Sequence, residues 1–205
     1  MKTADVIIVG SGASGLFNAL FLPQDYKVIV ITKKEVEESD SFLAQGGISA
    51  LKNPEDYDSY FEDTMKAGHY ENDKGAVEKM IKESPQIIQD LKDFGVRFDL
   101  KDGEIEFTRE GGHSTFRILH HEDLTGKEIT SHLYEEAKKR DNITIMENCT
   151  MIDIIEKDGE CKGIVYKDAD GNLDTIEAPD TVLATGGLGG LFNVSYTHLR
   201  AHETR

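Results

Sequence analysis

Two short β-branched runs, Asp5–Val9 and Lys27–Thr32, open the chain and predict buried parallel strands. The apolar segment Leu16–Leu22 lies between them and predicts a helix, with Pro23 just past its end. The chain therefore begins with a strand, a helix and a second strand.

The next part of the chain has the apolar spacing of helices. Apolar residues recur at helical spacing in three consecutive segments, Pro54–Gly68, Asp73–Glu83 and Pro85–Gly95. Pro85 predicts a helix start rather than an interior position, because proline lacks the N–H that a helix interior uses. A fourth amphipathic helix is predicted at Lys127–Arg140.

Strand patterns return in the second half. Val96–Phe98 and Ile105–Phe107 alternate around an Asp-Gly turn and predict a small hairpin. Ile143–Met146 predicts a third parallel strand. The remaining apolar runs predict an antiparallel meander and then a last apolar strand: Cys149–Lys157, Gly163–Lys167, Thr175–Ala178 and Thr181–Ala184.

A glycine turn joins the first strand to the first helix. Gly10-Ser-Gly12-Ala-Ser-Gly15 has the G-x-G-x-x-G spacing of dinucleotide-binding units. Gly10 permits the tight turn, Gly12 lets the backbone approach a pyrophosphate, and Gly15 lets the helix pack on the strand. The helix N-terminus supplies free N–H groups for phosphate. The alternative is a turn without a ligand, but the strand–turn–helix–strand context favours an α/β, Rossmann-like nucleotide-binding domain.

The end of the second strand does not choose between NAD and FAD. Dinucleotide sites usually carry an acidic residue about 20 residues past the glycines. Here Thr32-Lys33-Lys34 takes that place, with Glu35 one step late. Lys33 either lies against the nucleotide or is a solvated surface lysine.

Composition sets bounds on the class of protein. The 205 residues can bury a sizeable core, and one domain is the simplest expectation. The net charge of -16 disfavours a nucleic-acid or anionic-membrane partner. No apolar run approaches the about 20 residues of a membrane span, and the first strand follows Met1-Lys2 without room for a signal peptide. Cys149 and Cys161 lack metal-ligand spacing and are expected to be free thiols, so we expect a cytoplasmic protein without a metal site.

Three glycine-containing loops are candidates for ligand binding. The segment Phe42–Ala50 contains a Gly-Gly pair, which suits either backbone pressed against a flat ligand or a plain surface turn. The last predicted strand runs into Thr185-Gly186-Gly187, which could return to the nucleotide. Thr108–His121 gathers two arginines, a glutamate and three histidines without regular periodicity. Its cationic groups suit an anionic small molecule, and the equally weighted alternative is a structural loop.

With these motifs in place, the chain resembles the flavoprotein family of L-aspartate oxidase and the succinate dehydrogenase/fumarate reductase flavoprotein subunits. The resemblance runs from Ala4 to about Phe192 without a missing segment. It rests on five motifs: GSGASG at Gly10–Gly15, AQGGI at Ala44–Ile48, EDT at Glu62–Thr64, DLTG at Asp123–Gly126 and ATGG at Ala184–Gly187.

Two features favour the L-aspartate oxidase branch. Asp40 stands where the dehydrogenases carry the histidine that is covalently joined to the flavin, so the resemblance implies non-covalent FAD. The run REGGHS at Arg109–Ser114, followed by RILHHEDLTG, also looks like the oxidase branch.

The resemblance implies roles for particular residues. Glu110 matches the glutamate that orients the substrate ammonium, and His113, Ser114 and Arg117 are weaker substrate-site candidates. The implied FAD-binding residues are Gly10, Ser11, Gly12, Ala13, Ser14, Gly15, Lys33, Ser39, Asp40, Ser41, Gln45, Gly46, Gly47, Thr150, Met151, Thr185 and Gly186.

The implied reaction is oxidation of L-aspartate to iminoaspartate, with oxygen or fumarate as acceptor and quinolinate synthase as consumer of the product. Members of the family continue through a capping domain and the return of the FAD-binding domain, and their catalytic arginine lies in that later part, so the resemblance assigns no catalytic residue to this chain. We therefore expect residues 1–193 to be the N-terminal part of an FAD-binding domain, truncated before the capping domain, catalytically inactive alone and weak in FAD affinity. Val194–Arg205 lacks apolar periodicity and is expected to be a non-native tail. A fumarate reductase-like protein and a non-catalytic nucleotide-binding fragment are the alternatives.

Overall fold

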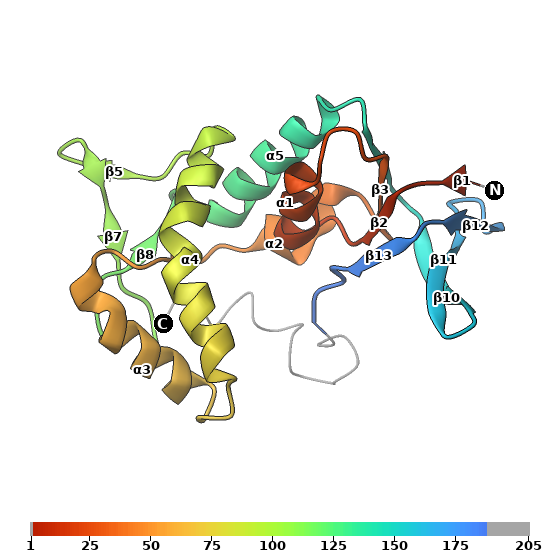
Figure 1. Ribbon diagram of the computed structural model, residues 1–205. Coiled ribbons are helices and arrows are strands. Elements are labelled where there is room, and N and C mark those ends of the chain that lie inside the picture. The colour runs from red at the N-terminus through yellow and green to blue at the C-terminus, as the bar shows by residue number, and fades with distance from the viewer. Residues whose placement is uncertain (1, 188–205) are drawn as a thin grey trace. The chain divides into compact units, whose positions relative to one another are not determined.

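A computed structural model describes residues 2–187 (Figure 1). The chain divides into two compact units. Unit 1 holds the residues up to Ala44 and those from Ile129 onward, and unit 2 holds Gln45–Glu128. The predicted fold class, a parallel sheet with helices and an antiparallel meander, is confirmed. The predicted tail, 194–205, lies outside the described residues.

Unit 1 is built on a four-stranded parallel sheet in the order β13-β2-β3-β9. The glycine turn leads from the second of these strands, β2, into helix α1, and β3 follows as predicted. The strands are β2 Val6–Val9, β3 Val28–Ile31, β9 Ile143–Met146 and β13 Asp180–Leu183, and helix α1 spans Ala13–Phe21. The helix begins three residues before the predicted start because Gly12 is its N-cap.

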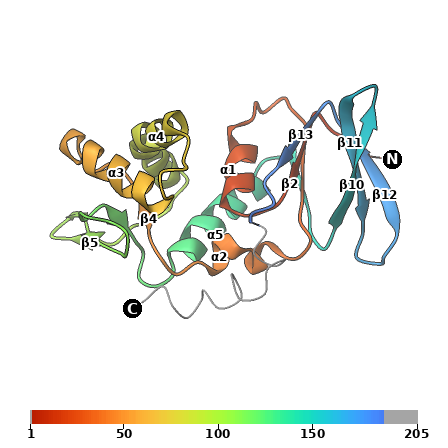
Figure 2. The ribbon, with the colours of Figure 1, turned by 90° about the horizontal axis from the view of Figure 1, so that it is seen from below.

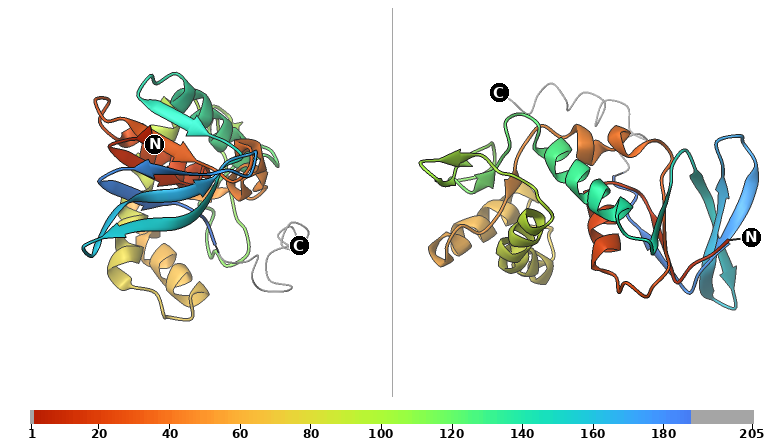
Figure 3. Two further views of the ribbon diagram at one scale, coloured as in Figure 1. Left: turned by 90° about the vertical axis from the view of Figure 1, so that its right-hand side faces the viewer. Right: turned by 90° about the horizontal axis from the view of Figure 1, so that it is seen from above.

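A second sheet of unit 1 is the predicted meander, in the order β1-β12-β11-β10. Its strands are β1 Lys2–Thr3, β10 Thr150–Lys157, β11 Glu160–Lys167 and β12 Leu173–Glu177. Figures 2 and 3 show α1 and α5, Thr125–Lys138, on one side of the parallel sheet and the meander on the other. Two short helical segments, η1 Val36–Glu38 and α2 Asp40–Leu43, follow β3.

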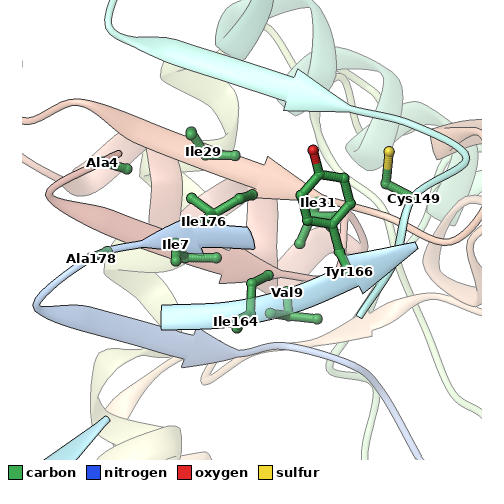
Figure 4. Close-up of a cluster of buried hydrophobic side chains, with 10 residues drawn as sticks. All are labelled: Ala4, Ile7, Val9, Ile29, Ile31, Cys149, Ile164, Tyr166, Ile176 and Ala178. Atoms are coloured by element: carbon green, nitrogen blue, oxygen red, sulfur yellow. The ribbon is translucent and has the colours of Figure 1, made fainter. Parts of the chain in front are cut away.

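The core of unit 1 lies on both faces of its parallel sheet. Side chains alternate along a strand, so one face of β2 and β3 meets the meander and the other meets the helices. Figure 4 shows the cluster on the meander side: Ala4, Ile7, Val9, Ile29, Ile31, Cys149, Ile164, Tyr166, Ile176 and Ala178. Both cysteines are free thiols, as predicted, and burial raises the pKa of the Cys149 thiol.

Unit 2 combines two helices with small antiparallel sheets. Helices α3 and α4 pack through a cluster of Tyr60, Met65, Val77 and Ile81. A three-stranded sheet has the order β4-β8-β7, and a separate hairpin pairs β5 with β6. The elements are β4 Ile48–Ser49, η2 Pro54–Asp56, α3 Tyr57–Ala67, α4 Lys74–Asp93, β5 Leu100–Lys101, β6 Glu104–Ile105, β7 Phe107–Thr108 and β8 Ile118–Leu119.

The predicted break at Pro85 is wrong, because α4 is one helix with Pro85 inside it. A proline at position 85 cannot donate to the carbonyl of Ile81, four residues earlier. The Ser84 hydroxyl donates to that carbonyl instead, at 2.7 Å. The same hydroxyl accepts the Leu51 N–H at 2.8 Å, so the helix continues with its buried groups satisfied.

The predicted hairpin has its turn at the predicted position, but the strands that pair across it differ from the predicted ones. Asp102 and Gly103 both have positive φ, 56° and 87°, as a two-residue type I′ turn requires. Such a turn pairs its immediate neighbours, so Leu100–Lys101 faces Glu104–Ile105 and Val96–Phe98 forms no strand. Among residues 2–187, no helix is both long enough and apolar enough to cross a bilayer.

Candidate cofactor and substrate site

The carboxyl ends of three parallel strands meet at the glycine turn of unit 1. The Gly10 N–H donates to the Ile31 carbonyl at the end of β3, at 2.8 Å. The Ala184 N–H, just past β13, donates to the Val9 carbonyl, also at 2.8 Å. The predicted return of the ATGG segment to the glycine turn is therefore present. Nucleotides bind at this edge of open α/β sheets.

Two glycines of the turn are required by close backbone contacts. Gly10 has a φ of 116°, and a Cβ there would lie 2.1 Å from the Ala184 carbonyl oxygen. A Cβ at Gly15 would lie 2.0 Å from the Gly10 carbonyl oxygen, so only glycine lets α1 approach the turn this closely.

The turn also has polar groups that suit a phosphate. The Ser11 side chain is 2% exposed, and its hydroxyl has no hydrogen-bond partner among the described residues. No side chain caps the N-terminus of α1, and its first turn carries no acidic residue. An uncapped helix start with an orphaned buried hydroxyl is the donor set that a pyrophosphate uses, and Gly12, Ala13 and Ser14 lie in the same turn.

The predicted adenosine side lies where β3 and β9 end. The Cys149 N–H donates to the Thr32 carbonyl at 2.9 Å, so the residue before Lys33 is bonded to the residue before Thr150 and Met151, where β10 begins. The Lys33 side chain is exposed.

The predicted segment Ser39–Ser41 forms the start of the short helix α2. The Ser39 hydroxyl caps it by accepting the Phe42 N–H at 3.2 Å. A Cβ at Gly12 would lie 2.9 Å from the Ser41 hydroxyl oxygen, so Ser41 lies against the glycine turn. Asp40, Thr185 and Gly186 are exposed, and Gly186 has a φ of 73°.

In unit 2, Glu110 lies on the Gly46-Gly47 pair. The Gly47 N–H donates to Glu110 Oε1 at 3.1 Å, and the Cβ position of Gly46 lies 3.4 Å from Glu110 Oε2. A Cβ at Gly47 would lie 2.4 Å from the Leu119 carbonyl oxygen, so the pair is pressed against β8. Gln45 is exposed. The residue predicted to bind substrate therefore touches the segment predicted to bind the flavin.

The Arg117 side chain is fully buried and uses all five of its N–H donors on protein acceptors. Nε donates to Asp56 Oδ2 at 2.9 Å, and Nη2 to Asp56 Oδ1 at 2.8 Å and to Ser59 Oγ at 2.7 Å. Nη1 donates to Asp63 Oδ2 at 2.6 Å and is 3.1 Å from His113 Nδ1. With no donor left, Arg117 is a structural residue rather than a substrate contact.

Two aspartates hold this arginine in place. The Arg117 guanidinium, with the Ser59 and Thr115 hydroxyls, lowers the pKa of Asp56 from 3.8 to about 2. Burial opposes ionisation of Asp63, but hydrogen bonds from Arg117 and Ser114 lower its pKa. Asp63 accepts both the Ser114 N–H and the Ser114 hydroxyl, each at 2.7 Å. The sequence prediction missed Asp56 as a site residue, whereas Asp63 lies in the EDT motif.

Several side chains of the Thr108–His121 loop have partners within unit 2. Arg117 is paired with two carboxylates, and burial, followed by the Arg117 charge, lowers the pKa of His113. His120 and His121 lie 3.1 and 3.4 Å from the Asp99 carboxylate. The contacts of Arg117 favour the structural alternative for this residue, because its guanidinium is already paired with two carboxylates.

Comparison with known proteins identifies the family of this chain. A model of the FAD-binding domain family matches residues 5–204. The chain belongs to the FAD-binding domain family. FAD is therefore the cofactor of this domain, in agreement with the orphaned Ser11 hydroxyl and the uncapped helix α1.

Relatives of this FAD-binding domain include L-aspartate oxidases. The L-aspartate oxidase of Clostridium perfringens is 43% identical over 194 residues, covering 95% of this chain and 44% of its own length. That of Clostridium acetobutylicum is 44% identical over 192 residues, covering 93% of this chain and 44% of its own. The chain thus spans less than half the length of these curated relatives.

Solved structures of oxidoreductases share the fold. Escherichia coli quinol fumarate reductase FrdA, with an E245Q mutation, matches 94% of this chain and 34% of its own at a TM-score of 0.87 and 28% identity. The Mycobacterium smegmatis Sdh1 complex matches 95% of this chain and 36% of its own at a TM-score of 0.85 and 31% identity. The FAD-binding fold predicted from sequence is confirmed.

Proposed function

We propose that the full-length protein carrying this domain oxidises L-aspartate to iminoaspartate with non-covalently bound FAD. The observation that carries the proposal is the Glu110 carboxylate held on the Gly47 N–H, within the AQGG segment. A carboxylate at that place can pair with a substrate ammonium group. The similarity to L-aspartate oxidases over nearly the whole chain supports the same conclusion.

The charge balance around Glu110 supports an amino-acid substrate. Asp56 and Asp63 share the single positive charge of Arg117, and Glu110 is a third carboxylate, which accepts the backbone N–H of Gly47. An excess of negative charge favours a ligand with an ammonium group over a plain dicarboxylate. Charge pairing with Glu110 would therefore separate aspartate from succinate, which dicarboxylate binding alone cannot do.

The residues around the glycine turn would hold the cofactor. Ser11 and the N-terminus of α1 would bind the pyrophosphate, Lys33 and Thr150 would lie on the adenosine side, and Gln45–Gly47 would face the flavin. FAD supplies a hydride acceptor when it is bound. The part played by this chain is to hold FAD and to orient the substrate ammonium through Glu110.

The rest of the proposal concerns partners and context. Oxygen or fumarate would serve as the electron acceptor, and quinolinate synthase would consume iminoaspartate. The two free thiols support the cytoplasm as the compartment. We propose that the 205-residue chain alone does not turn over aspartate, since it spans less than half of its relatives' length.

The visible spectrum of the full-length protein tests this function. Anaerobic L-aspartate should bleach the flavin band and succinate should not. Glu110→Gln should weaken aspartate bleaching, whereas Glu104→Gln, which changes an exposed carboxylate of the β5–β6 hairpin, should leave it unchanged. Equal bleaching by succinate would instead favour the second candidate, a fumarate reductase-like protein, which the structural similarity to FrdA supports. A colourless protein would contradict both.

A further inference from the structure

The hydrogen bonding of Arg117 fixes the protonation of a neighbouring ring. A guanidinium only donates hydrogen bonds, so a ring nitrogen in contact with it has to accept. Arg117 Nη1 lies 3.1 Å from His113 Nδ1, and the other four N–H donors of Arg117 already have acceptors. His113 Nδ1 is therefore the acceptor of the fifth donor, and the proton of the neutral ring resides on Nε2.

The other ring nitrogen, Nε2, is not engaged by the described residues. Within residues 2–187, no protein group accepts a hydrogen bond from His113 Nε2, and the side chain is only partly buried. The loop backbone joins His113 to Glu110, because the His113 N–H donates to the Glu110 carbonyl at 3.3 Å. The Ser114 hydrogen bonds to Asp63 hold the next residue.

We propose that His113 is a specificity-determining residue that Arg117 locks as a neutral imidazole, with Nδ1 accepting and Nε2–H offered to a substrate carboxylate. The proposal rests on the proposed function for the identity of the substrate, an amino acid with an acidic side chain. Arg117 and Asp63 are then positioning residues that act through His113 and Ser114.

The charged groups around the ring are consistent with this state. The Arg117 guanidinium opposes a positive charge on His113, while the carboxylates of Asp63, Glu110 and Asp56 favour one. Burial and Arg117 together outweigh the three carboxylates, so the pKa of His113 lies below its usual value. The ring therefore stays a neutral donor at pH 7 and leaves Glu110 free to pair with the ammonium group rather than with an imidazolium.

The protonation state can be measured in the 205-residue chain without cofactor or substrate. Two-bond ¹H–¹⁵N NMR of ring-labelled histidine, with the His113 signals assigned by their loss in His113→Gln, should show the Nε2–H tautomer at pH 7. The exposed His69 serves as the reference ring in the same spectrum. Arg117→Lys, which keeps the charge but loses the fork geometry, should let the Nδ1–H tautomer appear. An Nδ1–H tautomer or a protonated ring in the wild-type chain at pH 7 overturns the proposal, whether or not aspartate is the substrate.

The role in substrate binding is tested in the full-length protein. His113→Leu removes the donor and should lower kcat/KM for L-aspartate about tenfold or more, mainly through KM, because a hydrogen bond to a charged group is lost. His113→Gln, which retains an N–H donor, should recover much of the loss, and the control His69→Gln should change nothing. Equal values for His113→Leu and the wild type would overturn the substrate contact, while the NMR result would still decide the tautomer.

Discussion

The glycine turn of unit 1 and the Arg117 network of unit 2 differ in what builds them. The turn is made of backbone: glycines, strand ends and two main-chain hydrogen bonds at Gly10 and Ala184. The network is made of side chains, in which the Arg117 guanidinium donates hydrogen bonds to Asp56, Asp63 and His113. A backbone site is set by where small residues occur, whereas a side-chain network needs each partner. The two regions should therefore respond differently to substitution.

The largest expected effect is in the network. Arg117→Met leaves Asp56 and Asp63 without their counter-ion in a buried place, which should cost about 3–5 kcal/mol of unfolding free energy. Urea denaturation measures it. Arg97→Met is the matched control, because the Arg97 side chain is 73% exposed in its pair with Glu128 and should contribute at most about 1 kcal/mol. Similar losses for the two variants would contradict a buried network.

The glycine turn should respond to a single methyl group. Gly10→Ala adds a Cβ 2.1 Å from the Ala184 carbonyl oxygen at a φ of 116°, so strain and overpacking should cost about 2–3 kcal/mol and weaken FAD binding. Flavin fluorescence during FAD titration and urea denaturation report the two effects. The control is Gly187→Ala in the same segment, where a Cβ would meet nothing within 4 Å. A tolerated Gly10→Ala would mean that the turn is not constrained by β13.

The network should also be sensitive to acid. The pKa of Asp56 falls from 3.8 to about 2 on folding, so its contribution is fully present above pH 3.8 and is lost as the pH falls through about 2. The loss should be about 2 kcal/mol, with Asp63 acting in the same direction. Unfolding free energies measured between pH 3.8 and about 2 give the dependence of stability on pH.

Asp56→Asn is the variant that isolates the carboxylate. It should be less stable than the wild type at neutral pH and should show a flatter dependence between pH 3.8 and about 2, because amide hydrogen bonds do not titrate there. An unchanged slope would place the acid sensitivity elsewhere. The His113 pKa, lowered on folding, adds a separate and smaller loss of stability as the pH falls below 6.5.

The sequence predicts the parts of the molecule whose signal is local. The strand–turn–helix–strand unit, the meander and the last parallel strand all follow from β-branched runs and glycine positions, and the structure has them. Glycine spacing also predicts the nucleotide end of the sheet. These features are set by backbone conformation, which neighbouring residues in the chain decide.

The Arg117 network is not predictable in the same way. Its members, Asp56, Asp63 and Arg117, are separated by up to 61 positions, and nothing in their spacing shows that they meet. The composition of the loop suggested a cationic surface, because its partners on η2 and α3 are far away in sequence. The division into two units likewise has no sequence signal, since helix α5 runs through its boundary.

Pro85 shows that prediction from sequence can also fail within a single helix. The test at this position has the smallest expected effect on stability. The rule that proline ends a helix fails here because the Ser84 hydroxyl donates to the Ile81 carbonyl. Ser84→Ala should therefore cost about 1 kcal/mol in urea denaturation. Pro85→Ala restores a backbone N–H at position 85, so it should stabilise the Ser84→Ala chain more than it stabilises the wild type. This coupling between neighbours is what a double-mutant cycle measures. Additive effects would mean that the hydroxyl does not replace the missing N–H, and α4 would need another explanation for crossing its proline.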